Sequence, residues 1–271
     1  MDFDPDEVRE FERAGWNRAA AGYEAAFATA TRPFIAPLLD AASIGTGDIV
    51  LDLCCGPGFV GAVAGERGAR VSGLDFSPAM LAEARARFPA IAFAHGDAEA
   101  PPFPDATFDA VVSNFGIHHV PRPALALAGV HRILKPGGRF AFSVWAGHDE
   151  NIAWKLVFDA VRRFGDPNAS AAPHPGGGFA TGEDCLIALH DAGFTGTRAH
   201  LVRDVWRHRD AASLLDSLRA GTARMAAMLA AQPAAAMPAI LSGLERSTRP
   251  WRDGEGIAAP IACVVAAGTR P

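Results

Sequence analysis

The chain has 271 residues, with 25 Lys or Arg and 30 Asp or Glu, so its formal net charge is −5. That length suits one large α/β domain or two small ones, and we expect one domain with insertions. No run of basic residues is present that would follow a phosphate backbone, so nucleic acid is not expected as the main partner.

Two common chemistries have little support in this sequence. The chain contains only two lysines, Lys135 and Lys155, which leaves two candidates for a Schiff base. It contains no GxxxxGK[ST] segment, so a P-loop nucleotide site is excluded.

Cysteine usage and the first residues indicate a reduced, cytoplasmic setting. The cysteines form no CxxC pair, and two of them are adjacent, where a mutual disulfide would be strained; they are Cys54, Cys55, Cys185 and Cys263. Residues 1–13 are acidic and lack the basic and then apolar order of a secretory signal. The most apolar long window, residues 222–241, is interrupted by Arg224 and two prolines, so no membrane span is expected.

Residues 7–39 are expected to form one or two helices that cover another part of the protein. An apolar stripe follows them at helical spacing, formed by Trp16, Tyr23, Phe27 and Phe34. From residue 48 the pattern changes to short apolar runs that alternate with helix-like segments. Such alternation predicts a parallel sheet with crossover helices.

After Trp145 the alternation becomes looser. The stretch DPNASAAPHPGGGFA, residues 166–180, predicts a surface loop. Residues 181–184, TGED, resemble a capping box that opens a helix ending at Gly193. A long strand over 197–208, a helical stretch over 211–231 and a closing strand over 259–268 complete the expected elements.

The stretch DIVLDLCCGPGFVG, residues 48–61, predicts a ligand site. A strand over 48–53 runs into a glycine turn and then into a helix that begins near Phe59, and free N–H groups and the helix dipole converge at such a point. Gly56, Gly58 and Gly61 satisfy the GxGxxG spacing, and Asp75 ends the next strand, so a dinucleotide site has to be considered.

Asp52 separates two ligand classes at this turn. A carboxylate there would repel a pyrophosphate, whereas it would stabilise the sulfonium and ammonium groups of S-adenosylmethionine. Tyr23 is the only tyrosine and precedes the turn, so the Tyr-x-x-x-Lys pair of short-chain dehydrogenases cannot be formed. The residues therefore favour the sulfonium ligand over a dinucleotide.

Four segments in order resemble class I S-adenosylmethionine-dependent methyltransferases, in the small-molecule branch that includes the ubiquinone/menaquinone type. They are VLDLCCGPG, VSGLDFSPAML, GDAEAPPFPDATFDAVVSNFGIHHV and ILKPGGRF, which together lie between Asp48 and Ala146. The resemblance covers about 100 residues, and the four segments in order are much more specific than any one of them.

The resemblance implies a set of cofactor contacts. Asp52 and the backbone of Cys54, Gly56 and Gly58 would border the methionine end, and Asp75 would bind both ribose hydroxyls. The adenine would lie between Phe76 and Met80, with Asp97 and Ala98 at its amino edge and Asn114 beneath the sulfonium. The family usually has glycine where Cys54 stands, so either the position tolerates a β-carbon or the backbone is displaced.

Methyl transfer needs alignment and the exclusion of water, and a base helps if the acceptor carries a proton. His118 and His119 follow the fourth strand, and because adjacent side chains tend to point in opposite directions, at most one is expected to face the substrate. The alternative is that they only order the loop. Trp16 and Tyr23 resemble the family's N-terminal cover, so Tyr23 joins the two histidines as a catalytic candidate, with a purely structural role for both aromatics as the alternative.

The expected fold is one α/β domain, residues 1–271, with a doubly wound, mostly parallel, seven-stranded sheet of the Rossmann-like methyltransferase type. Residues 40–146 would bind the cofactor, and residues 7–39, 147–180 and 209–248 would cover the acceptor. Met225, Met228 and Met237 would line an apolar acceptor pocket or belong to the core.

The expected activity is in-line methyl transfer from S-adenosylmethionine to a small molecule, with no metal. Two alternatives stay open: an NAD(P)-dependent oxidoreductase that uses the same glycine loop, and a protein that binds the sulfonium compound for other chemistry. The patterns do not distinguish oxygen, nitrogen, sulfur or carbon as the accepting atom, and they leave the oligomeric state open.

Overall fold

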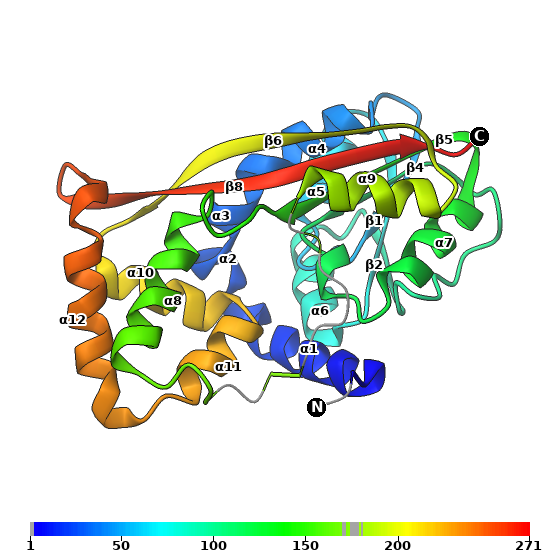
Figure 1. The fold of residues 1–271 in the computed structure, drawn as a ribbon. Coiled ribbons are helices and arrows are strands. Elements are labelled where there is room, and N and C mark those ends of the chain that lie inside the picture. The colour runs from blue at the N-terminus through cyan, green and yellow to red at the C-terminus, as the bar shows by residue number, and fades with distance from the viewer. Residues whose placement is uncertain (1–2, 170–171, 174–178, 180) are drawn as a thin grey trace.

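The computed structural model describes residues 3–169, 172–173, 179 and 181–271. Its centre is a mixed sheet in the order β3-β2-β1-β4-β5-β8-β6, with a short β7 paired to β8 (Figure 1). The strands are β1 Ile49–Leu53, β2 Arg70–Asp75, β3 Ala92–His95, β4 Phe108–Asn114, β5 Leu134–Trp145, β6 Thr195–His208, β7 Arg252–Asp253 and β8 Gly256–Thr269. Strands β1 to β5 pair in parallel, and β8 runs antiparallel to both β5 and β6. The predicted doubly wound, mostly parallel sheet is confirmed, with β7 added to the seven strands expected.

Helices cover both faces of this sheet. They are α1 Pro5–Ala19, α2 Tyr23–Ala26, α3 Ala28–Thr31, α4 Ile35–Ala41, α5 Phe59–Glu66, α6 Pro78–Arg87, α7 Pro123–Ile133, α8 Ile152–Phe164, α9 Gly182–Asp191, α10 Ala211–Gly221, α11 Arg224–Ala230 and α12 Met237–Ser247. Short 3₁₀ turns are η1 Ala20–Gly22, η2 Arg32–Phe34, η3 Ile117–His119, η4 Ala234–Ala236 and η5 Arg249–Trp251. Val50 and Leu51, neighbours on β1, belong to separate hydrophobic clusters because strand side chains alternate between the two faces.

Local sequence signals explain where several helices begin. Ser77 caps α6 by accepting a hydrogen bond from the Met80 N–H at 3.2 Å, and Pro78 occupies the first helical turn. Thr181 and Asp184 form the expected capping box of α9. These side chains satisfy backbone N–H groups that have no partner inside the helix.

The N-terminal cover is more broken than expected. The sequence predicts one or two helices over 7–39, and the structure has α1, α2, α3 and the start of α4, with η1 between α1 and α2, Phe27 between α2 and α3, and η2 between α3 and α4. Gly22 lies in η1 and Pro33 in η2, and both residue types interrupt α-helix. The cover therefore changes direction along its length, and its last helix, α4, packs on the central strands β4, β5 and β8.

Helices α8, α10, α11 and α12 lie together below one end of the long β6–β8 ribbon, on the left in Figure 1. The helical stretch predicted over 211–231 is divided into α10 and α11, and at the break the Thr222 hydroxyl donates to the Leu218 carbonyl at 2.7 Å. Trp206 of β6 is buried, and its Nε1–H donates to the Thr29 hydroxyl at 2.9 Å. This contact ties the ribbon to the N-terminal cover.

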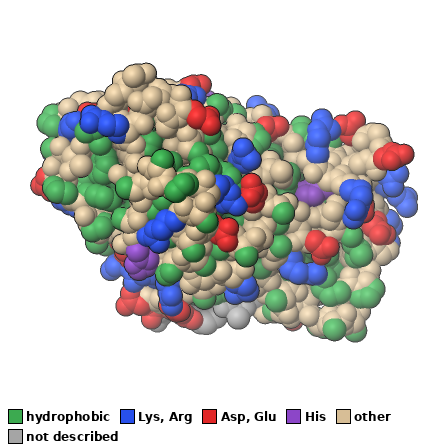
Figure 2. Space-filling model, turned by 180° about the vertical axis from the view of Figure 1, so that it is seen from behind, with side chains coloured by type: hydrophobic (Ala, Val, Ile, Leu, Met, Phe, Trp, Pro, Cys, Tyr) green, Lys and Arg blue, Asp and Glu red, His purple; other side chains and the backbone are tan. Residues whose placement is uncertain are grey.

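The surface of the described residues mixes both signs of charge. On the face drawn in Figure 2, basic and acidic side chains are interspersed, unlike the single-sign stripe that follows a phosphate backbone. Within the described ranges, no single helix has the length and hydropathy to cross a bilayer, and one helix pair with a 97° bend, 224–230 with 234–247, passes by length and composition only. The loop expected at 166–180 falls partly outside the described residues.

Candidate functional site

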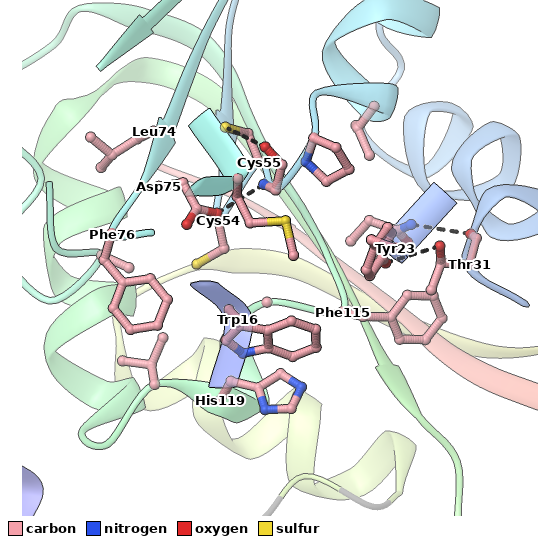
Figure 3. A pocket seen from close by; sticks show the side chains of 18 of the residues that line it. Trp16, Tyr23, Thr31, Cys54, Cys55, Leu74, Asp75, Phe76, Phe115 and His119 are labelled. Carbon is pink, nitrogen blue, oxygen red and sulfur yellow. Dashed lines mark hydrogen bonds between the residues drawn. The ribbon is translucent and has the colours of Figure 1, made fainter. Parts of the chain in front are cut away.

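A cavity of about 1050 Å³, counted to its open mouth, lies where the parallel strands end. The turn after β1, the ends of β2 and β4 and the helices of the N-terminal cover form its wall (Figure 3). Ten of the thirteen residues predicted for the site line it: Tyr23, Cys54, Gly56, Asp75, Phe76, Met80, Asp97, Ala98, Asn114 and His119. Asp52, Gly58 and His118 are not among the lining residues.

The glycine turn after β1 is held by backbone contacts. The Cys55 N–H donates to the Leu74 carbonyl, and the Gly58 N–H donates to the Cys55 carbonyl, both at 3.0 Å. Gly58 has a φ of +85°, and a β-carbon there would lie 2.9 Å from the Phe93 ring. Only glycine fits this position, because a side chain would be strained by the backbone angle and would collide with the Phe93 ring.

Cys54 resolves the departure from the family pattern. Its φ is +58°, so this residue adopts the left-handed conformation that a glycine would adopt freely, at a cost of about 1 kcal/mol or more. Gly116 faces it closely, since a β-carbon on Gly116 would lie 2.4 Å from the Cys54 β-carbon. The position tolerates a β-carbon, and it does so because the facing residue has none.

Asp75 ends β2 with its carboxylate under the turn. One oxygen accepts the Gly56 N–H and the other accepts the Ser77 N–H, both at 2.8 Å. Burial raises the pKa of Asp75 above its usual value, and the backbone N–H donors oppose that rise. Asp75 therefore fixes the turn and presents its remaining lone pairs to the pocket that it lines.

Asp52 lies behind the wall as a buried acid. Its side chain is 1% exposed, and Oδ2 accepts the Gly61 N–H at 3.0 Å. Oδ1 has no hydrogen-bond partner among the described residues. Burial raises the pKa of Asp52 to about 8, the Gly61 N–H opposes this, and the nearby charge of Asp75 adds to it. The turn thus carries an acid without a compensating cation.

The charges around the cavity fit a cationic ligand better than a diphosphate. Arg9 is the one Lys or Arg among the described lining residues, and it is already paired with Asp97 and Glu99, at 2.8 Å each. Asp52 and Asp75 are close enough for the charge of Asp75 to raise the pKa of Asp52. A sulfonium and an ammonium would relieve that repulsion, whereas a pyrophosphate would increase it.

The residues predicted around the adenine lie together on one side of the cavity. Met80 and Ala98 are 2% and 7% exposed, and Phe76 lies on the wall beside Asp75 (Figure 3). Both oxygens of Asp97 are in use, one by the Glu99 N–H at 2.9 Å and one by Arg9. Arg9 therefore fastens α1 to this side of the pocket.

Asn114 and Tyr23 anchor the cover on the opposite side. Asn114 donates from Nδ2 to the Thr31 carbonyl at 3.2 Å, and its Oδ1 accepts the Ser143 hydroxyl at 2.6 Å. The hydroxyls of Tyr23 and Thr31 lie 3.2 Å apart. Burial raises the pKa of Tyr23 to about 12, so this phenol keeps its proton near neutral pH and does not act as a base there.

The two histidines have different surroundings, as adjacent residues in η3. His119 lines the cavity, and its ring meets Trp16 edge-on at 5.0 Å between centroids (Figure 3). His118 is off the wall, and its Nδ1 is buried without a hydrogen-bond partner among the described residues. Burial lowers the pKa of His118 well below its usual value, and the charges of His119 and Arg224 lower it further. His118 is therefore neutral near neutral pH and does not line the cavity.

Sequence reasoning missed the polar residues that hold the cover in place. Glu99, 3% exposed, binds Arg9 of α1 at 2.8 Å and Arg122 of the loop before α7 at 2.6 Å. Glu12 of α1 is fully buried and contacts Trp16, His119 and Arg224. Its position four residues before Trp16, on the apolar stripe, was the available signal.

The methionines expected around an acceptor are not on the cavity wall. Met225 and Met228 are buried in the core, and Met237 packs against that core. The described residues of 147–180 and 209–248 contribute no side chain to the wall. Helices α10 and α11 of these segments pack against α2 and α1 of the N-terminal cover, and the expectation that the segments cover an acceptor stays a prediction.

Known proteins resemble this chain in sequence and in fold. Residues 51–142 match the family model described as a methyltransferase domain. The chain is 35% identical over 180 residues to the ubiquinone/menaquinone biosynthesis C-methyltransferase of Methylobacterium nodulans, covering 55% of this chain and 67% of that relative. The matches to three other curated relatives span 50%, 47% and 57% of their lengths, so the chain spans about half of those proteins.

Solved structures share the fold. The Haemonchus contortus phosphoethanolamine N-methyltransferase 2, solved with S-adenosylhomocysteine, has a TM-score of 0.54 at 21% identity, over 89% of this chain and 53% of that one. The [4+2]-cyclase SpnF has a TM-score of 0.50 at 16% identity, over 87% and 80%. Since these structures show the fold alone, the family is established by sequence, through the relative covered over two thirds of its length. The chain belongs to the class I S-adenosylmethionine-dependent methyltransferases.

Proposed function

We propose that this chain transfers a methyl group from S-adenosylmethionine to a small-molecule acceptor. The observation that carries the proposal is the uncompensated acid beside the glycine turn. Asp52 is buried with a raised pKa and one unpartnered oxygen, and Asp75 ends the neighbouring strand. A ligand that brings positive charge to this turn removes an energetic cost that the protein otherwise bears.

The wall offers a matching group for each part of the cofactor. Asp75 has free lone pairs for two ribose hydroxyls, and the Gly56 backbone borders the methionine end. Phe76 and Met80 give the apolar surfaces that an adenine requires, and Asp97 lies at their edge. Asp52 does not line the pocket, and the positive charge of the bound ligand would favour the ionised form of this acid. Residues 40–146 would thus supply most of the cofactor contacts.

When bound, S-adenosylmethionine supplies an electrophilic methyl carbon, which gains the acceptor's electron pair as the pair of its bond to sulfur stays on sulfur. The chain's own contribution is alignment and the exclusion of water. Aromatic side chains from the cover and from the strand ends supply the apolar part of the wall: Trp16, Tyr23, Phe27, Phe115 and Trp145. Phe115 and Trp145 are stacked at 3.9 Å, which makes a flat, rigid surface for an apolar acceptor body.

Transfer of label from the methyl donor tests this proposal. We expect that incubation with methyl-labelled S-adenosylmethionine and a metabolite extract will move label into low-mass compounds and release an equal amount of S-adenosylhomocysteine. Extract without protein, and protein without extract, are the controls. Binding of the donor without any movement of label would overturn methyl transfer and favour other chemistry, for which the fold has a precedent in a [4+2]-cyclase.

A further inference from the structure

Glu12 is a buried carboxylate that joins three segments far apart in the sequence. It lies in α1 and is 0% exposed. Its Oε1 accepts the Arg224 Nε–H at 2.6 Å, and its Oε2 accepts the Trp16 Nε1–H at 3.1 Å. The Nδ1 atom of His119 lies 3.2 Å from the same Oε2. Burial by itself would raise the pKa of Glu12, but His119 and Arg224 outweigh it and the pKa is lowered, so the carboxylate stays ionised.

The position of Glu12 determines which nitrogen of His119 is left for the pocket. Nδ1 faces Oε2 of Glu12 at ion-pair distance but outside hydrogen-bond geometry, and Nε2 lies on the other side of the ring, with no hydrogen-bond partner among the described residues. Trp16 meets the His119 ring edge-on and binds Glu12 as well, so all three side chains hold one arrangement (Figure 3 shows the two rings). A carboxylate on one ring nitrogen fixes the tautomer and orientation of the other.

We propose that Glu12 is a positioning residue that makes His119 the proton acceptor of the methyl-transfer site. The inference rests on the proposed function and adds to it that the acceptor carries a removable proton. Nε2 of His119 takes that proton, the acceptor keeps the electron pair, and the carboxylate of Glu12 stabilises the resulting imidazolium. The imidazolium then gives the proton to water after the product leaves.

The groups packed around Glu12 and His119 come from separate elements. Described contacts place Glu12 from α1, Arg224 from α11 and His118 from the same turn around His119. Arg224 pairs with Oε1 of Glu12, and the ring of His118 lies 4.2 Å from the ring of His119 between centroids. Because Glu12 comes from α1, the base is complete only when this helix packs over the cavity. The helix that covers the pocket is therefore also the helix that brings Glu12 to His119.

Imidazole ¹⁵N NMR of the full chain tests the proposal without an acceptor. In the wild type, we expect the neutral His119 ring to carry its proton on Nδ1, with signals identified by their loss in His119→Gln. Glu12→Gln removes the charge at nearly constant shape, and we expect it to shift the neutral His119 ring toward the tautomer with its proton on Nε2. A purely structural Glu12 would change thermal stability without this shift.

Glu10→Gln is the matched control, because Glu10 lies on the same helix with an exposed side chain paired to Arg13. It should leave the His119 signals and the methyl transfer unchanged. A wild-type ring with its proton on Nε2, or an unchanged tautomer in Glu12→Gln, would overturn the proposal. The wild-type tautomer decides the matter even if Glu12→Gln fails to fold. Absence of S-adenosylhomocysteine binding in the wild type would instead refute the proposed function, a result that these signals do not report.

Discussion

Asp75→Ala is expected to weaken S-adenosylhomocysteine binding by about 10- to 100-fold. Hydrogen bonds to a charged group contribute about 1.5–3 kcal/mol, and each 1.4 kcal/mol is a factor of ten in affinity. The buried carboxylate also holds the glycine turn, through the N–H groups of Gly56 and Ser77. Both the contact and the shape of the turn are lost in the variant. Isothermal titration calorimetry measures the change directly.

Two further variants make this result interpretable. Asp75→Asn keeps the volume and one acceptor oxygen, so it should fold and bind with intermediate affinity. Asp105→Ala removes an exposed carboxylate, 74% exposed and paired with Arg132, and should leave affinity unchanged. Equal affinity in the wild type, Asp75→Asn and a folded Asp75→Ala would show that the ligand lies elsewhere.

Asp52→Asn is expected to stabilise the ligand-free protein increasingly as the pH rises. The pKa of Asp52 is about 8 in the folded state, against about 3.9 in an unfolded chain. Between these values the folded state holds one more proton than the unfolded state, so the free energy of unfolding of the wild type falls as pH rises. Asparagine is neutral throughout and escapes this loss. Its advantage over the wild type should grow by on the order of 2–4 kcal/mol from pH 5 to pH 8.

Denaturant unfolding of both proteins at several pH values provides the measurement. Asp109→Asn is the matched control, because Asp109 accepts a hydrogen bond from Lys135 at 2.7 Å and its pKa is lowered. That stabilisation is present above the unfolded pKa and is lost only as pH falls through the lower folded pKa, so this variant should differ from the wild type by a constant amount between pH 5 and pH 8. A constant difference for Asp52→Asn as well would mean that Asp52 is already charged and compensated.

Asp52→Asn separates the effect of this acid on stability from its effect on ligand binding. If a cationic ligand relieves the buried charge, Asp52→Asn should gain stability and lose affinity for S-adenosylmethionine. Asp52 would then lower the stability of the ligand-free protein and raise its affinity for the cationic ligand. Ligand sites are places where proteins keep buried, poorly compensated charges that a stable core would otherwise exclude.

Much of the sheet could be predicted because its signals are local. Alternating strands and helices, the cap at Ser77 and the capping box at Thr181 each depend on residues a few positions apart. The break between α10 and α11, by contrast, has no glycine or proline at its centre. Ala223 there fits against Gly15 of α1, where a β-carbon would lie 2.5 Å away. Such packing across the chain is not visible in a window of sequence.

The candidate site shows the same division. Cys54 and Asp75 could be placed on the pocket because a strand that ends at a turn fixes them. Asp52 and His118 could not, since adjacent positions differ in the direction of their side chains, which only the folded backbone sets. Glu12 escaped prediction because its partner Arg224 lies 212 residues away. The role of a glutamate on an apolar stripe can be predicted only when its partner in the folded protein is known.

Equilibrium binding of two ligands to the wild-type chain tests the central claim most directly. Titration with S-adenosylhomocysteine and, separately, with NADH should give micromolar affinity for the first and no binding for the second. The carboxylates at the glycine turn favour positive charge and repel a diphosphate, which is the physical basis of this result. Binding of NADH without binding of S-adenosylhomocysteine would contradict it.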